Sequence, residues 1–106
     1  MITNVVVTYQ IKPDSLDEHV RLIEGVFDQL RGDAPSNVEY KVMKLEDGVS
    51  FVHVSTADTP DGANPLPALE AFQAFAKELD ARITTSPSVA NATIIGSYIP
   101  AGGLGT

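Results

Sequence analysis

The residues best suited to acid–base chemistry in this sequence are His53 and Arg82. His53 lies in the middle of VSFVHVST (residues 49–56), where apolar and polar side chains alternate and predict a strand. An imidazole ordinarily titrates close to neutral pH, so His53 can act as a general base or as a hydrogen-bond donor to a substrate oxygen. The alternative is a core histidine whose ring nitrogens are satisfied by neighbouring groups.

Arg82 follows Phe75 by seven residues and therefore borders the apolar stripe of a predicted helix. There its guanidinium can orient an anionic or enolate substrate through charge-assisted hydrogen bonds. Alternatively, its stem packs along the helix and its charge stabilises the helix C-terminus. We predict His53 and Arg82 as the catalytic residues, with both structural alternatives open.

A further set of side chains is predicted to bind the substrate beside His53. Aromatic and polar side chains share one face of the hairpin that contains His53, as is typical of a ligand pocket. An asparagine at the start of the second helix either presents its amide to a ligand or caps the helix. The aromatic members either line the pocket or fill the core, and a tyrosine can do both with its ring and its hydroxyl. The predicted substrate-binding residues are Tyr40, Phe51, Asn64, Phe72 and Tyr98.

The composition excludes several other kinds of site. The sequence has no cysteine, so it offers no thiolate nucleophile, thiolate metal site or disulfide. Its two histidines have no metal-ligand spacing with each other or with a carboxylate cluster, so no metal is predicted. A net charge of -7 disfavours nucleic acid and membrane surfaces as partners. A small-molecule ligand is the predicted partner, and the lack of cysteine and of a signal-like N-terminus favours the cytoplasm.

The elements that position these residues begin with a strand and a helix. The β-branched run ITNVVVTYQI predicts a strand at residues 2–11. Apolar side chains at helical spacing predict a helix over residues 16–31. Ser15 and Glu18 fit a capping box at its start, and Gly32 is a natural stop at its end.

A hairpin follows, with predicted strands at residues 38–45 and 49–56. Asp47-Gly48 predicts a two-residue turn between them. This turn sets the register, so that Lys44 faces Phe51, Val42 faces His53 and Tyr40 faces Ser55.

The second half of the chain predicts one more helix and one more strand. The helix runs from about Leu66 to Ile83, the strand covers residues 89–99, and residues 100–106 form a flexible tail. The order is therefore βαββαβ, an α+β ferredoxin-like fold with a four-stranded antiparallel sheet and both helices on one face. Residues 1–99 form a single domain. The free sheet face carries apolar side chains, and a second copy of the sheet would cover it, so we predict a homodimer.

Three stretches resemble a known family. They are YKVMKLEDGVSFVHV (residues 40–54), AFQAFAKELDARI (residues 71–83) and IIGSY (residues 94–98). The chain from Ile2 to Ile99 resembles the antibiotic-biosynthesis-monooxygenase-like proteins of the dimeric α/β-barrel superfamily. The resemblance implies a dimeric barrel with a pocket between sheet and helices in each protomer. The sequence has no tryptophan, which haem-degrading members use in that pocket, so haem degradation is not predicted.

Two functions are consistent with these observations. The resemblance implies a cofactor-independent monooxygenase, an oxidoreductase acting on a small aromatic or enolisable molecule. The alternative is a non-catalytic small-molecule-binding or stress-associated protein of the same fold. An open cavity that reaches His53 would favour an enzyme or a ligand binder, and a cavity filled by its own side chains would favour the second function without a ligand.

Overall fold

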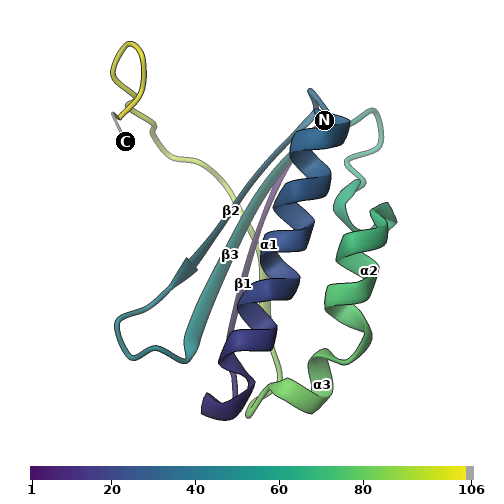
Figure 1. Ribbon diagram of the computed structural model, residues 1–106. Coiled ribbons are helices and arrows are strands. Elements are labelled where there is room, and N and C mark those ends of the chain that lie inside the picture. The colour runs from purple at the N-terminus through teal and green to yellow at the C-terminus, as the bar shows by residue number, and fades with distance from the viewer. Residues whose placement is uncertain (105–106) are drawn as a thin grey trace.

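The computed structural model describes residues 1–104, and residues 105 and 106 of the predicted tail lie outside that range. Four strands form one antiparallel sheet in the order β2-β3-β1-β4, and the helices cover one of its faces (Figure 1). This arrangement confirms the predicted α+β ferredoxin-like fold. The elements are β1 (Ile2–Gln10), a 3-10 turn η1 (Pro13–Ser15), α1 (Leu16–Asp33), β2 (Val38–Lys44), β3 (Ser50–Asp58), a 3-10 turn η2 (Leu66–Ala68), α2 (Glu70–Lys77), α3 (Leu79–Arg82) and β4 (Ser88–Ala92).

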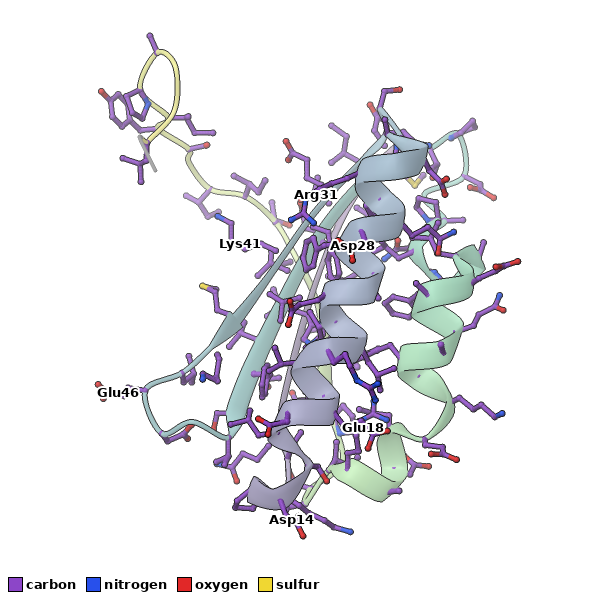
Figure 2. The ribbon with its side chains drawn as sticks, in the orientation of Figure 1. Asp14, Glu18, Asp28, Arg31, Lys41 and Glu46 are labelled. Atoms are coloured by element: carbon purple, nitrogen blue, oxygen red, sulfur yellow. The ribbon has the colours of Figure 1, made fainter. Side chains whose placement is uncertain are left out.

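The predicted ends of α1 differ from those observed. Ser15 is the N-cap but its side chain makes no capping hydrogen bond, so the capping box is wrong. Instead Pro13 opens the 3-10 turn η1, which leads directly into α1. At the other end the helix continues through Gly32 to Asp33, and Ala34 takes the left-handed conformation, with φ 48°. On the exposed side of α1, Asp28 and Arg31 form an ion pair in which Oδ1 of Asp28 lies 3.3 Å from Nη1 of Arg31 (Figure 2).

The hairpin has the predicted register but a different turn. Lys44 pairs with Phe51, Val42 with His53 and Tyr40 with Ser55. The loop spans four residues between Leu45 and Ser50, and the Leu45 amide donates to the Ser50 carbonyl at 2.9 Å. Within it, Gly48 has a φ of 77°, and the Asp47 carboxylate accepts the amides of Val49 and Ser50. A two-residue and a four-residue loop centred on the same point give the same pairing, so the register is unaffected.

The second helical segment is interrupted, whereas the sequence predicted one continuous helix. The chain enters through η2, forms α2, breaks at Glu78 and resumes as the single turn α3. Glu78 has φ -123° and ψ 29°, which ends the regular helix after Lys77. The break leaves the Phe75 carbonyl without its usual helical donor, and the Arg82 guanidinium donates to it through Nη2.

The last strand is shorter than predicted. Only Ser88–Ala92 pair with β1, opposite Asn4 to Thr8, and the following residues leave the sheet (Figure 1). No strand of this chain continues beside residues 93–99 within the described range, so their backbone has no ladder partner. Large apolar side chains are exposed in this segment and just after it, namely Ile94, Ile95, Tyr98, Ile99 and Leu104.

The core lies between the sheet and the helices. It is built around Tyr9, Ile11, Ile23, Phe51 and Phe75, all buried. Because successive side chains along a strand point to opposite faces, every second side chain of each strand lies on the sheet face away from the helices. That face includes the adjacent pairs Val6–Val54 and Val52–Met43, and Met43 is exposed. Among residues 1–104, no helix is long and apolar enough to cross a membrane.

Candidate functional site

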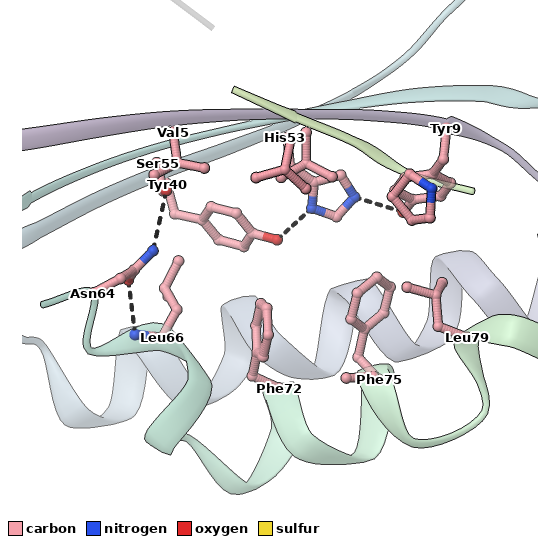
Figure 3. A pocket seen from close by; sticks show the side chains of 14 residues that line it. Val5, Tyr9, Tyr40, His53, Ser55, Asn64, Leu66, Phe72, Phe75 and Leu79 are labelled. Carbon is pink, nitrogen blue, oxygen red and sulfur yellow. Dashed lines mark hydrogen bonds between the residues drawn. The ribbon is translucent and has the colours of Figure 1, made fainter. Parts of the chain in front are cut away.

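A cavity of about 250 Å³ lies between the sheet and the segment from Asn64 to Leu79 (Figure 3). Its wall is mainly apolar, and its polar atoms come from three aromatic side chains of the sheet and from Ser55 and Asn64. A space of this size suits a ligand of about one ring. The lining residues are Val5, Val7, Tyr9, Tyr40, His53, Ser55, Asn64, Leu66, Phe72, Phe75, Ala76, Leu79, Pro87 and Val89.

A continuous chain of hydrogen bonds begins at this cavity and runs into the core. The Tyr40 hydroxyl lies 2.6 Å from Nδ1 of His53, and Nε2 of His53 lies 2.6 Å from the Tyr9 hydroxyl. The Tyr9 hydroxyl also lies 2.7 Å from Nε2 of His19. Arg82 completes the chain, since its Nε donates to Nδ1 of His19 over 3.1 Å. We call these five residues the hydrogen-bonded chain.

Strand register explains how three members of the hydrogen-bonded chain meet. His53 on β3 pairs with Val42 of β2 and Val7 of β1. Tyr40 and Tyr9 are each two residues from those partners, on the same face, so both are diagonal neighbours of His53. Helix α1 supplies His19, which bonds to Tyr9 from the helical side of the sheet. Helix α3 supplies Arg82, which bonds to His19.

Each ring nitrogen and hydroxyl oxygen in the hydrogen-bonded chain has a hydrogen-bond partner. His19 is 0% exposed, Arg82 4% and His53 7%, and each ring nitrogen of both histidines has a partner. Across residues 1–104, no buried side-chain nitrogen or oxygen lacks a hydrogen bond. A buried network whose nitrogens and oxygens all have partners is rigid, so it holds the Tyr40 hydroxyl at a fixed position on the cavity wall.

Burial keeps the hydrogen-bonded chain neutral except at its arginine. It lowers the pKa of His53 to about 4, and burial together with the nearby charge of Arg82 lowers the pKa of His19 to about 4. Burial also raises the pKa of Tyr9 and of Tyr40 above their ordinary value. At neutral pH both imidazoles are therefore uncharged, both phenols keep their protons, and Arg82 carries the charge.

The structure brings together four of the predicted site residues. His53, Tyr40, Asn64 and Phe72 line the cavity. Asn64 is not the helix cap, because Pro65 is the N-cap of η2 and no side chain caps it. The Asn64 amide oxygen accepts the Leu66 amide at 3.0 Å, and its nitrogen donates to the Ser55 hydroxyl at 3.3 Å.

The other three predicted residues lie away from the cavity wall. Phe51 is buried in the core behind it, stacked on Tyr9 with ring centroids 5.9 Å apart. Arg82 does not line the cavity, and it joins the site through His19 and through Phe75, whose carbonyl accepts from its guanidinium. Tyr98 is 88% exposed on the segment after β4, so the prediction that it lines the pocket is not met within one chain.

Sequence reasoning did not identify Tyr9 and His19 as part of the site. Tyr9 shares its strand face with Val5 and Val7, and in the structure this face lies under the helices. His19 falls on the buried side of α1 with Ile23 and Val26. A histidine at a core position of a helix was the available signal, because a buried imidazole requires polar partners.

The described residues offer no metal site, since no cluster of three or more His, Cys, Asp or Glu side chains could hold an ion among residues 1–104. The site therefore consists of an apolar cavity with a neutral tyrosine–histidine pair on its wall and a buried positive charge behind it. Such a site can bind a small apolar molecule and stabilise an oxygen atom that gains negative charge.

Comparison with solved structures identifies the fold. A crystal structure of an antibiotic biosynthesis monooxygenase superposes with a TM-score of 0.73 at 16% identity, covering 91% of this chain and 100% of that one. Rv0793 from Mycobacterium tuberculosis gives 0.74 at 12% identity, covering 92% and 98%. A protein from Nitrosomonas europaea, provisionally named an antibiotic biosynthesis monooxygenase, gives 0.73 at 12% identity, covering 89% and 90%.

Sequence comparison adds nothing to this assignment. No family model matches the chain, and no curated protein matches it. The chain has the fold of the antibiotic biosynthesis monooxygenase structures.

Proposed function

We propose that this chain is a cofactor-independent monooxygenase-like enzyme that acts on a small aromatic or enolisable molecule. The observation that carries the proposal is the cavity of about 250 Å³, whose mainly apolar wall holds the Tyr40–His53 pair. An apolar ring fits the wall, and an ionisable oxygen on that ring fits the tyrosine–histidine pair.

The chemistry needs no redox group from the protein, because the substrate supplies the electrons. An electron-rich phenol or enol loses a proton, and the resulting anion reduces dioxygen and forms a carbon–oxygen bond to it. Cleavage of the oxygen–oxygen bond then leaves one oxygen on the substrate and releases the other as water, so that SH₂ and O₂ give SO and H₂O. The protein binds the anion, orients it and keeps bulk water away.

His53 acts at the cavity as base or hydrogen-bond donor, together with Tyr40. Phe72, Leu79 and Val89 provide apolar contacts, and Asn64 with Ser55 offers a second polar point at another part of the wall. Arg82 is a positioning residue, since it acts through His19 rather than on the substrate.

Oxygen consumption tests the proposal. A panel of hydroquinone-like and enolisable substrates should include some that drive oxygen uptake, and His53→Ala should reduce that uptake by at least tenfold. Arg31→Met, on the exposed side of α1, is the control for general effects of substitution. The absence of uptake across the panel, or equal uptake by His53→Ala, would contradict the proposal. Ligand binding without uptake would instead support the non-catalytic binding protein.

We also infer that the functional unit is a homodimer. The sheet face opposite the helices carries Val6, Val52 and Val54, and Met43 at its edge is exposed. The segment after β4 exposes further large apolar side chains. Packing of two such sheets would bury both sets. A monomeric mass in solution at micromolar concentration would contradict this inference.

A further inference from the structure

Arg82 fixes the direction of every hydrogen bond in the hydrogen-bonded chain. A guanidinium N–H can only donate, so Nδ1 of His19 must accept. His19 is neutral and therefore carries its hydrogen on Nε2, which donates to the Tyr9 hydroxyl oxygen. The opposite tautomer would place two N–H groups against each other over 3.1 Å.

The same reasoning continues from Tyr9 to the cavity. The Tyr9 oxygen already accepts from His19, so its hydrogen is directed to its other partner, Nε2 of His53. His53 then carries its own hydrogen on Nδ1 and donates to the Tyr40 oxygen. If His53 donated to Tyr9 instead, the Tyr9 hydrogen would have no acceptor in a buried site.

The end of the hydrogen-bonded chain is the hydrogen of the Tyr40 hydroxyl. The Tyr40 oxygen accepts from His53, and the structure shows no other hydrogen-bond partner for it among the described residues. The residue lines the cavity, so its free hydrogen is available there (Figure 3). We propose that Tyr40 is a hydrogen-bond donor to the ligand, and that the cavity selects a one-ring or similarly small molecule whose buried polar group is a phenolate or enolate oxygen.

Electrostatics favours the ionised form of such a ligand. None of the residues that line the cavity is acidic, and the hydrogen-bonded chain ends at the buried guanidinium of Arg82, which carries a positive charge. Hydrogen bonds aligned in one direction polarise one another, so this charge strengthens the donor at Tyr40. A neutral phenol could still accept this bond but would gain less from it, because hydrogen bonds to charged acceptors are about twice as strong.

This inference rests on the proposed function in that it names the substrate class of the same cavity, and it assigns separate roles within the hydrogen-bonded chain. Tyr40 contacts the ligand, whereas Tyr9, His19 and Arg82 are positioning residues. His53 presents N–H to Tyr40, so it serves as a donor relay in the resting enzyme rather than as the base.

The first test reads the tautomers directly. Nitrogen-15 NMR of the imidazoles at pH 7 should show the hydrogen of His19 on Nε2 and that of His53 on Nδ1. Tyr9→Phe should leave His19 unchanged, because Arg82 still donates to it, and should release His53 into a mixture of tautomers. Arg82→Lys, which keeps a donor, should retain both tautomers better than Arg82→Met. The opposite tautomers in the unaltered protein, or no change at His53 in Tyr9→Phe, would overturn the proposal.

The second test measures binding without turnover. The probe is 4-nitrophenol, with 4-nitrotoluene as a ligand of similar shape that lacks the hydroxyl. We expect the bound phenol to ionise at lower pH than the free phenol, as its visible absorbance reports. Tyr40→Phe should weaken phenolate binding about 10- to 100-fold, the range expected for a hydrogen bond to a charged group. The same substitution should leave the affinity for 4-nitrotoluene within about twofold of that of the unaltered protein.

The outcomes separate this proposal from the proposed function. Failure of 4-nitrophenol to bind at millimolar concentration, or equal phenolate affinity in Tyr40→Phe, overturns the donor assignment even if oxygen uptake is observed. Selective phenolate binding with the expected tautomers supports the donor assignment even if no substrate drives oxygen uptake, in which case the monooxygenase proposal alone fails.

Discussion

Acidification should destabilise this fold through His19 and His53 before most carboxylates titrate. In the unfolded chain both imidazoles take up protons near their ordinary pKa of about 6.5. In the folded chain their pKa is about 4, because both are buried and because His19 also faces Arg82. As the pH falls from 6.5 to 4, the unfolded state therefore binds protons that the folded state does not, and the free energy of unfolding decreases.

The size of this effect follows from the two shifts. Each shift of roughly 2.5 pH units corresponds to about 3.5 kcal/mol, since one unit is worth about 1.4 kcal/mol. The two sites interact, and Tyr9, Tyr40 and Arg82 also face them, so the sum of about 7 kcal/mol is an upper bound. A domain of this kind has a total stability of roughly 5–15 kcal/mol. Loss of several kcal/mol should therefore unfold much of the protein near pH 4, with the full contribution present above pH 6.5.

Urea unfolding at half-unit steps from pH 5 to 7.5 measures the effect. In the pH range in which both histidines titrate only in the unfolded state, the free energy of unfolding should fall by about 2 to 3 kcal/mol for each pH unit of acidification. His53→Gln removes one titrating group, so the slope should fall to about half. A flat profile between pH 5 and 6.5, or an unchanged slope in His53→Gln, would refute the assignment of buried neutral imidazoles.

Three other perturbations test different parts of the structure. Gly48→Ala should cost roughly 1–2 kcal/mol in thermal or urea unfolding, because Gly48 has φ 77°, whereas Gly96→Ala, outside the left-handed region, should be near neutral. Val54→Lys places a charge on the open sheet face and should shift the sedimentation mass from dimer to monomer while far-UV circular dichroism is retained. The pH midpoint of oxygen uptake should follow the acidity of the substrate, so two phenols of different pKa should differ in midpoint. A shared midpoint near 6.5 would point to a protein group instead.

Alternation of side chains and the position of the turn were sufficient to predict much of the fold from the sequence. The register of β2 and β3 is set by the position of the turn and by which side chains must face the helices, so it survived the wrong loop length. The pairing of Val42 with His53 and of Tyr40 with Ser55 placed the pocket face correctly. Alternation along β1 puts Tyr9 on one face with Val5 and Val7, but no local signal showed that the helices cover this face.

The features that the sequence did not predict, namely the bond between Arg82 and His19, the break at Glu78 and the short last strand, depend on contacts between distant parts of the chain. The bond between Arg82 and His19 joins residues 63 positions apart, and no local signal reports it. The break at Glu78 interrupts a segment whose apolar stripe continues regularly. Residues 93–99 have strand-like composition, but a strand forms only where a neighbouring edge is available. Because β1 begins at Ile2, its edge at the observed register reaches no farther than residue 94.

The two interpretations of His53 considered from the sequence are compatible in the structure. Both ring nitrogens are satisfied by neighbours, as in a core histidine, yet one of those neighbours is the hydroxyl that faces the cavity. A histidine buried in this way, with a pKa of about 4, is a weak proton acceptor at neutral pH. Its position is instead suited to passing the polarisation of a buried guanidinium to Tyr40. A substrate held there must already be an acid of moderate strength, because the site stabilises its anion rather than supplying a strong base to create it.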